Sequence, residues 1–160
     1  MKKIVLLTAI TLLGGIFAAH AQGFEQEGIA AGNVEMGGYA SITSYDGDTS
    51  MFVGGTIGYF IKDEIEVGGG IFLFDSDYSD SMTLRPFGKY IFHVHPTIVP
   101  YAGGAIVYSK VGGGDSSMGL NVNGGCNFFI TENTSVGPEL NIDFNDGTTI
   151  TVLGQFKTYF

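Results

Sequence analysis

An alternation of apolar and polar residues runs through the last third of the chain, from Met118 to Phe160. In segment 118–130 the even positions are apolar or small, and most odd positions are polar or small. Segments 135–145 and 149–160 repeat this pattern. A period of two residues is typical of a β-strand that has one apolar and one polar face. The pattern therefore predicts three consecutive strands at the end of the chain.

The glycine content supports the same fold class for the rest of the chain. The sequence has 26 glycines among 160 residues, without the every-third-residue period of collagen, and so many glycines disfavour a helical protein. Five earlier segments fit the strand pattern less cleanly: 33–45, 51–61, 65–74, 82–92 and 97–109. Eight spans of about 11 residues fit between residues 22 and 160, whereas ten would leave too few for the connections. We predict an all-β fold, an eight-stranded antiparallel up-and-down transmembrane β-barrel.

The N-terminus has the three parts of a secretory signal peptide. Lys2 and Lys3 precede an apolar run at 4–17, and Ala19 and Ala21 form a small-residue cleavage site. The apolar run is shorter than the ~20 residues that a transmembrane helix needs. We expect a signal peptide at 1–21, cleavage after Ala21, secretion across the inner membrane and a barrel domain at 22–160.

Charge and cysteine content exclude several partners. Seven basic residues against 16 acidic ones give a formal net charge of −9, so a nucleic-acid partner is not expected. The single cysteine, Cys126, excludes an intramolecular disulfide and a cysteine-based zinc cluster.

The connections between the expected strands alternate in character. Four are mostly polar and carry Asp: 46–50, 75–81, 110–117 and 145–147. The other three are short: 62–64, 93–96 and 131–134. Membrane barrels have short periplasmic turns and longer outer loops, and a closed barrel is the way for strands to cross lipid.

Aromatic residues precede each short connection and recur at the C-terminus. In a barrel they lie at one height, where aromatic rings favour the lipid–water boundary. The alternative is that Tyr and Phe are simply good strand formers. The expected periplasmic girdle comprises Tyr59, Tyr90, Phe92, Phe128 and Phe160.

Three blocks, at 99–104 (VPYAGG), 136–140 (VGPEL) and 156–160 (FKTYF), together with the eight strands, resemble the small outer-membrane β-barrel proteins. These are the OmpX-like, opacity-protein-like and OmpA-transmembrane-domain-like barrels of the porin type. The resemblance implies a bacterial outer-membrane location and contact with outer-membrane lipid and lipopolysaccharide. The sequence does not determine the oligomeric state, and a monomer is favoured. The resemblance also implies that Phe156 and Phe160 form the assembly signal that the outer-membrane insertion machinery reads. Thr158 departs from that signal, which usually has an apolar residue there.

The expected barrel interior carries charges. An eight-stranded barrel is just wide enough for side chains to fill, and a buried charge is costly unless it is paired. We expect a lumen charge network that plugs the barrel, made of Glu35, Glu66, Arg85, Lys89, Glu139, Asp143 and Lys157. Glu66 would lie beside Lys89, and Lys157 beside both Glu139 and Glu35, whereas Arg85 and Asp143 would have to meet across the lumen. The alternative is a narrow ion channel.

No catalytic, cofactor or metal site is expected. His93 and His95 fall in a periplasmic turn, where they are better read as solvent-exposed turn residues than as metal ligands or catalytic groups. Segment 75–80 concentrates three carboxylates that could suit Ca²⁺, but a solvated loop is the simpler interpretation.

The sequence thus predicts a small integral outer-membrane barrel with a structural or surface-interaction role and no enzymatic activity. A soluble periplasmic or secreted lipocalin-like ligand-binding barrel is the alternative from another class. Pro86, Pro100 and Pro138 argue mildly against a barrel, because each removes a ladder donor, and we expect bulges or strand ends there.

Overall fold

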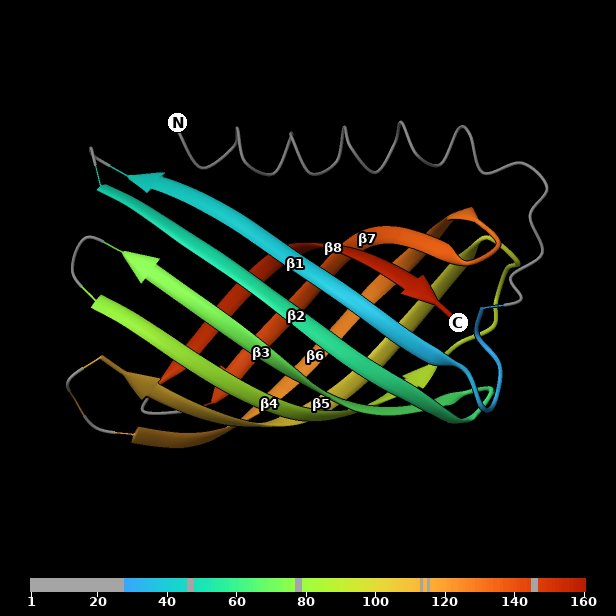
Figure 1. The fold of residues 1–160 in the computed structure, drawn as a ribbon, viewed down its shortest axis with the longest axis horizontal. Coiled ribbons are helices and arrows are strands. Elements are labelled where there is room, and N and C mark those ends of the chain that lie inside the picture. The colour runs from blue at the N-terminus through green and yellow to red at the C-terminus, as the bar shows by residue number, and fades with distance from the viewer. Residues whose placement is uncertain (1–27, 46–47, 77–78, 113, 115, 145–146) are drawn as a thin grey trace.

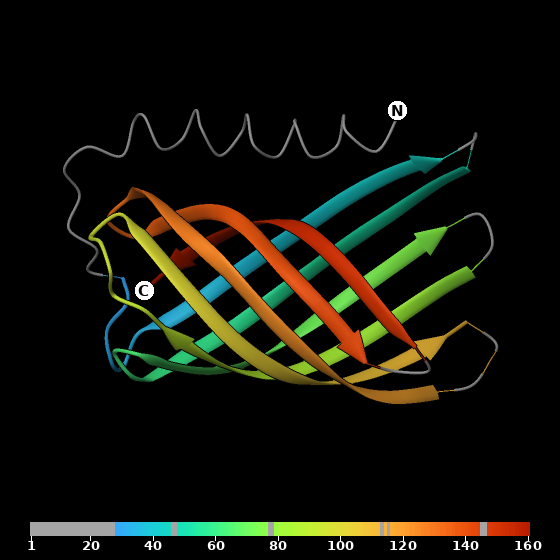
Figure 2. The same cartoon turned by 180° about the vertical axis from the view of Figure 1, so that it is seen from behind.

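The chain forms one closed barrel of eight antiparallel strands (Figures 1 and 2). The computed structural model describes residues 28–160 except 46–47, 77–78, 113, 115 and 145–146, so the expected signal peptide lies outside the described residues. The strands are β1 (Val34–Tyr45), β2 (Asp48–Lys62), β3 (Ile65–Ser76), β4 (Ser79–Ile91), β5 (Ile98–Val111), β6 (Ser116–Thr131), β7 (Thr134–Phe144) and β8 (Thr148–Tyr159). Each strand pairs with its neighbours in sequence, and β8 pairs with β1. The predicted fold class is confirmed.

The barrel has two distinct ends. The connections β2–β3, β4–β5 and β6–β7, the segment 28–33 and the C-terminal Phe160 lie at one end, on the right in Figure 1, which we call the turn end. The opposite end, where β1 meets β2 and β7 meets β8, is called the loop end. The expected length asymmetry is wrong, because the strands at the loop end run on to within two to four residues of each other. Backbone pairing continues past the apolar part of each strand, so polar residues expected in loops belong to strands.

No helix among the described residues is long and apolar enough to cross a membrane.

The prolines sit differently from the expectation. Pro100 lies near the start of β5, as expected, but Pro86 and Pro138 lie inside β4 and β7. Pro86 stays opposite Gly69 of β3, while the ladder to β5 has no residue pair between Leu84 and Phe87. Proline lacks an N–H on one side only, so it interrupts one ladder without displacing the strand.

The register shifts lie elsewhere. One falls between Phe60 and Lys62 in β2, and the other between Phe129 and Thr131 in β6. Both are at the turn end, just before a tight connection. Among the described residues the strands therefore have no register shift at Pro86 or Pro138, where we expected bulges or strand ends, and Pro138 remains opposite Gly154 of β8.

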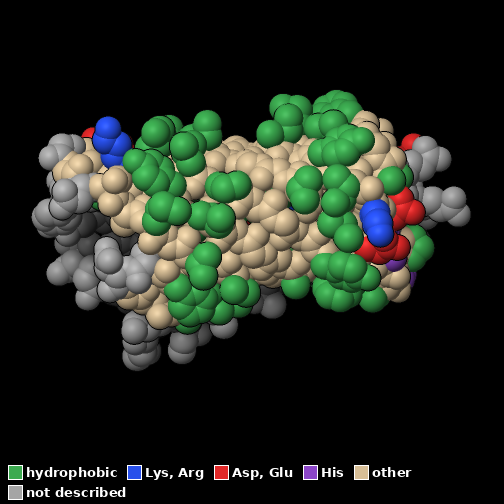
Figure 3. Space-filling view, turned by 90° about the horizontal axis from the view of Figure 1, so that it is seen from below, with side chains coloured by type: hydrophobic (Ala, Val, Ile, Leu, Met, Phe, Trp, Pro, Cys, Tyr) green, Lys and Arg blue, Asp and Glu red, His purple; other side chains and the backbone are tan. Residues whose placement is uncertain are grey.

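Large apolar side chains are exposed on all eight strands. On the face drawn in Figure 3 they gather in two zones, one toward each end of the barrel, with few hydrophobic side chains between them. The strands also carry glycine pairs, since Gly38 is opposite Gly55 and Gly88 is opposite Gly104. Soluble monomers rarely expose apolar surface of this extent.

The interior is divided into layers. An apolar cluster fills the turn end and consists of Ile29, Phe60, Ile91, Val99, Tyr101, Phe129 and Tyr159. Nearer the loop end, Tyr39, Phe72 and Leu153 form a second cluster against which Phe52 packs. Charged and amide side chains are buried among these clusters.

Candidate functional site

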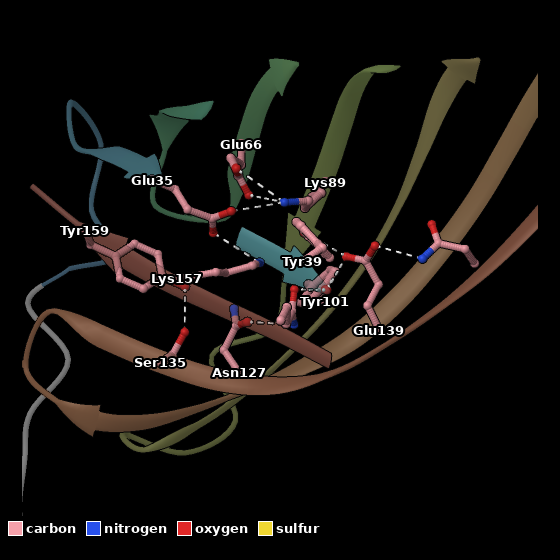
Figure 4. Close-up of polar contacts among 12 residues, drawn as sticks. Glu35, Tyr39, Glu66, Lys89, Tyr101, Asn127, Ser135, Glu139, Lys157 and Tyr159 are labelled. Atoms are coloured by element: carbon pink, nitrogen blue, oxygen red, sulfur yellow. Dashed lines mark hydrogen bonds and ion pairs between the residues drawn. The ribbon is translucent and has the colours of Figure 1, made fainter. Parts of the chain in front are cut away.

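Four buried charges form the ion-pair cluster of the lumen (Figure 4). The Nζ of Lys89 lies 3.3 Å from Oε1 of Glu35 and 3.2 Å from Oε2 of Glu66. The Nζ of Lys157 lies 3.2 Å from Oε2 of Glu35. All four side chains are almost fully buried, and two carboxylates balance two ammonium groups. The cluster is therefore electrically neutral.

Strand register explains why these residues meet. Glu66 of β3 is directly opposite Lys89 of β4, so their side chains share the inner face. Glu35 of β1 is opposite Tyr159 of β8, and Lys157 occupies the preceding inward position of β8. Closure of the barrel thus completes the cluster, because Glu35 and Lys157 come from opposite ends of the sequence.

Glu139 belongs to a different layer. Its Oε2 lies 2.5 Å from the Tyr101 hydroxyl and accepts a 3.2 Å hydrogen bond from that of Tyr39, and its Oε1 accepts a 2.9 Å bond from Asn141. The Tyr101 hydroxyl also lies 2.9 Å from Oε1 of Gln155. Tyr101 connects these residues to the ion-pair cluster, because the Nζ of Lys157 lies 4.4 Å from the centre of its ring.

Glu139 and Lys157 lie on adjacent strands, as expected, but they are not opposite each other. On β7 and β8, Glu139 is opposite Leu153, whereas Lys157 is opposite Ser135. The two charges lie on adjacent strands but on different rungs, so each finds another partner.

Arg85 crosses the lumen from β4 to β7. Its Nη1 donates to Oδ1 of Asn141 at 2.8 Å, and its Nη2 lies 3.4 Å from Oδ1 of Asp143. Its guanidinium carbon lies 4.7 Å from the centre of the Phe72 ring. The expectation that a long side chain joins these strands across the lumen matches this geometry.

A cavity of about 470 Å³ lies on the loop-end side of Arg85. Because Thr149 at its rim is exposed, the cavity opens to solvent at the loop end. Its lining is mixed and consists of Ser41, Phe52, Phe74, Ser81, Thr83, Arg85, Val107, Ser109, Asn141, Asp143, Thr149, Thr151 and Leu153. The lumen therefore ends in a cavity with a mixed polar and apolar lining, which we call the loop-end cup.

An apolar layer lies between the ion-pair cluster and the turn end of the barrel. The sequence pattern was not used to predict it. Phe60 and Phe129 are fully buried, as is Tyr159, whose ring stacks on Phe129 at 5.3 Å. Ile29, from the segment before β1, packs into the same layer. We call this layer the apolar plug.

The signal for the apolar plug was present in the aromatic doublets. Adjacent residues of a strand point to opposite faces, so one member of each doublet faces outward and the other inward. Tyr59 is exposed while Phe60 is buried, and Phe160 is exposed while Tyr159 is buried. The outward-facing residue of each doublet predicts the girdle, and the inward-facing residue predicts the apolar plug.

The five girdle residues lie at the turn end on the outer face. Tyr59, Tyr90, Phe92 and Phe160 are exposed, and Phe128 is half-buried. The rings of Tyr90 and Phe92 contact each other at 5.1 Å.

The expected assembly-signal residues, Phe156 and Phe160, are both exposed on the outer face of the C-terminal strand. Between them, the Thr158 hydroxyl donates to the backbone oxygen of Asn133 at 3.2 Å. A hydrogen bond to the neighbouring turn thus accounts for a polar residue at this position.

The two histidines lie at the turn end and contact the chain itself. His93 Nε2 is 3.0 Å from the Asp63 carbonyl oxygen, and His95 Nδ1 accepts from the Thr97 amide at 3.2 Å. In the acidic segment, Asp75 and Asp80 face each other as a cross-strand pair of β3 and β4. Within the described part of the chain, no three His, Cys, Asp or Glu side chains are grouped so that they could hold a metal ion.

No protein-family model and no curated protein sequence matches the chain. Several solved structures match the fold of this chain. The N-terminal β-barrel domain of Pseudomonas aeruginosa OprF matches with a TM-score of 0.68 at 16% identity, over 81% of this chain and 98% of that one. The outer membrane protein OprG from Pseudomonas aeruginosa matches with 0.58 at 15% identity, over 84% and 99%.

A third match is Neisserial surface protein A, with a TM-score of 0.56 at 15% identity, over 79% of this chain and 91% of that one. At these identities the likeness shows a shared fold. The chain has the eight-stranded fold of the small outer-membrane barrels, and the resemblance drawn from the sequence is confirmed at that level.

Proposed function

We propose that this protein is a small integral barrel of the bacterial outer membrane, with a closed lumen, no catalytic activity, and a role in envelope structure or surface interaction. The observation that carries the proposal is that the usual distribution of side chains is reversed: large apolar side chains are exposed on every strand, while charged and amide side chains are buried inside the barrel. Lipid is the solvent in which such an arrangement is stable.

This inversion disfavours the lipocalin-like alternative. A soluble ligand-binding barrel needs an apolar lumen and a polar exterior. In this barrel the middle of the lumen holds four buried charges: Glu35, Glu66, Lys89 and Lys157. The loop-end cup is lined in part by Arg85 and Asp143.

The closed lumen disfavours the ion-channel alternative. An ion entering from the loop end would meet the Arg85 layer, then the hydrogen bonds of Glu139, then the ion-pair cluster and finally the apolar plug. Breaking a buried ion pair costs about 3–5 kcal/mol, and an apolar layer offers an ion no replacement for water. The lumen is therefore blocked twice, once by paired charge and once by hydrocarbon.

The proposed partners follow from the same surfaces. The exposed apolar side chains would contact outer-membrane lipid and lipopolysaccharide. The insertion machinery would read Phe156 and Phe160, and the barrel would work as a monomer. Catalysis has little support, because His93 and His95 lie at the turn end, away from the loop-end cup.

Two measurements test the proposal. The first is the gel mobility of the outer-membrane fraction in detergent with and without boiling, where a heat-dependent shift is expected from a detergent-resistant barrel. Recovery in the soluble fraction with no shift would overturn the membrane placement.

The second measurement is the conductance of the purified barrel in planar lipid bilayers, with a general porin as the positive control. We expect no steady current above the background of the protein-free bilayer. Reproducible current steps from the wild-type barrel would replace the closed lumen with the narrow ion channel.

A further inference from the structure

We propose that the loop-end cup is a binding site for a neutral saccharide, which would insert one pyranose ring between an aromatic wall and a polar wall. The volume of about 470 Å³ falls within the range of about 300–1,000 Å³ that is usual for small-molecule sites. The cup is distinct from the ion-pair cluster, because the Arg85 and Glu139 layers lie between them.

The aromatic wall is formed by β2 and β3. Phe52 and Phe74 are directly opposite each other in the register of these strands, and both line the cavity. Phe52 also stacks on Phe72 at a centroid distance of 5.5 Å, which fixes the plane of its ring. Pyranose rings carry C–H groups on one face, and such a face packs well on a phenyl ring.

The polar wall is formed by β7 and β8, which lie across the barrel from β2 and β3 (Figures 1 and 2). Asp143 is opposite Thr149, and Asn141 is opposite Thr151, so a carboxylate, an amide and two hydroxyls line one side. These groups can both donate hydrogen bonds to the edge hydroxyls of a sugar and accept hydrogen bonds from them.

Arg85 forms the floor of the cup. Its Nη1 donates to Asn141 and its Nη2 lies 3.4 Å from Oδ1 of Asp143, so the guanidinium group is held in place.

Charge favours a neutral ligand. The positive charge of Arg85 is offset by Asp143 within the cup, so the lining carries no net charge. A neutral pyranose satisfies the mixed lining better than a carboxylate or phosphate ligand.

Two sources would present the same chemistry: a free sugar and the terminal residue of a surface glycan. The idea that the sugar arrives from outside the cell rests on the proposed outer-membrane placement. Sugar binding by the barrel in detergent does not depend on that placement. A failure to bind sugar therefore says nothing against the outer-membrane placement, and a failure of the placement says nothing against sugar binding.

The test is a saturation-transfer NMR titration of the folded barrel in lauryldimethylamine oxide, a detergent without a sugar head group. The probes are glucose, galactose, mannose, N-acetylglucosamine, their methyl glycosides, and glucuronate. We expect saturable binding of at least one neutral sugar and weaker binding of glucuronate than of glucose. Equal binding of a methyl glycoside assigns a glycan terminus, and binding of only the free sugar assigns a free ligand.

Matched variants locate the site. Phe74→Ala removes half of the aromatic wall and should weaken binding about three- to tenfold. Leu73→Ala, on the outer face of the same strand, should leave binding unchanged, and Thr151→Val should weaken it without changing the cavity volume. The heat-dependent gel shift of each variant verifies that it is folded.

Three outcomes would overturn the proposal: no saturable binding of any neutral sugar, equal binding by Phe74→Ala and the wild type, or tighter binding of glucuronate than of every neutral sugar.

Discussion

The ammonium group of Lys157 lies 3.2 Å from Oε2 of Glu35, and this ion pair bridges the seam where β8 closes on β1. Only six residue pairs join these two strands, fewer than in any other ladder of the described residues. A short ladder leaves more of the closure to side chains. We infer that the ion-pair cluster both fills the lumen and holds the seam.

The first prediction is that Glu35→Gln destabilises the barrel strongly, because it leaves Lys157 without a counter-charge at a site with almost no water access. We expect a loss of about 3–5 kcal/mol in the free energy of unfolding, and a similar loss for Lys157→Met. The double variant Glu35→Gln/Lys157→Met keeps the remaining Lys89–Glu66 pair balanced and should lose less than either single variant. Urea unfolding of the refolded barrel in lipid vesicles measures all four proteins.

The loss of unfolding free energy in the double variant is compared with the sum of the losses in the two single variants. If the double variant loses as much as that sum, the two residues do not interact, and the seam role should be abandoned.

Alternation alone predicts much of the fold and of the interior. A side chain's face depends only on whether its position is odd or even within a strand, so Glu66, Lys89 and Arg85 can be assigned to the lumen before any pairing is known. The pairing of Glu139 could not be assigned in this way, because its partner depends on the register between β7 and β8. Strand ends were also beyond reach, since residues such as Asp48 and Ser116 pair in ladders despite their polar character.

The apolar plug was overlooked for a different reason. A doublet such as Phe128–Phe129 contributes one ring to each face, and composition does not say that both faces are apolar at that height. The same period that predicts Phe128 as lipid-facing predicts Phe129 as lumen-facing, so the information lay in the sequence. An eight-stranded barrel is filled by side chains along its interior, so apolar residues at inward positions are expected to pack together there.

The second prediction uses this doublet. Phe129→Ala should cost about 3–5 kcal/mol of unfolding free energy, because it leaves a cavity among Tyr159, Phe60 and Val99. Phe128→Ala deletes the same group from the outer face, where lipid or detergent fills the space, and should cost clearly less. The same vesicle-based urea titration compares them. Equal losses would mean that Phe129 packs no better than a lipid-exposed ring and that the plug does not stabilise the barrel.

The third prediction concerns a glycine that makes room for the ion-pair cluster. A Cβ on Gly58 of β2 would overlap the carboxylate of Glu66, which its ion pair with Lys89 holds in place. We expect Gly58→Ala to cost about 1–3 kcal/mol, because Glu66 can yield only by leaving Lys89. Gly55→Ala, on the outer face of the same strand, meets only ordinary contacts and should be close to neutral. A Gly58→Ala barrel as stable as Gly55→Ala would show that Glu66 moves freely and that its ion pair contributes little.

The fourth prediction tests the orientation of the barrel across the membrane. In membrane barrels the short turns face the periplasm, so the turn end should be hidden from the outside of an intact cell. Lys110 near the loop end and His95 at the turn end are both exposed. A difference in their reaction with a reagent added outside the cell should therefore come from the membrane alone. In a Cys126→Ala background, Lys110→Cys should react with a membrane-impermeant maleimide on intact cells, whereas His95→Cys should react only after the outer membrane is permeabilised. Labelling of His95→Cys alone on intact cells would invert the orientation. If neither variant reacts before permeabilisation and both react afterwards, the protein lies on the periplasmic side of the outer membrane and does not reach the cell surface. Either result would move the loop-end cup away from the cell exterior.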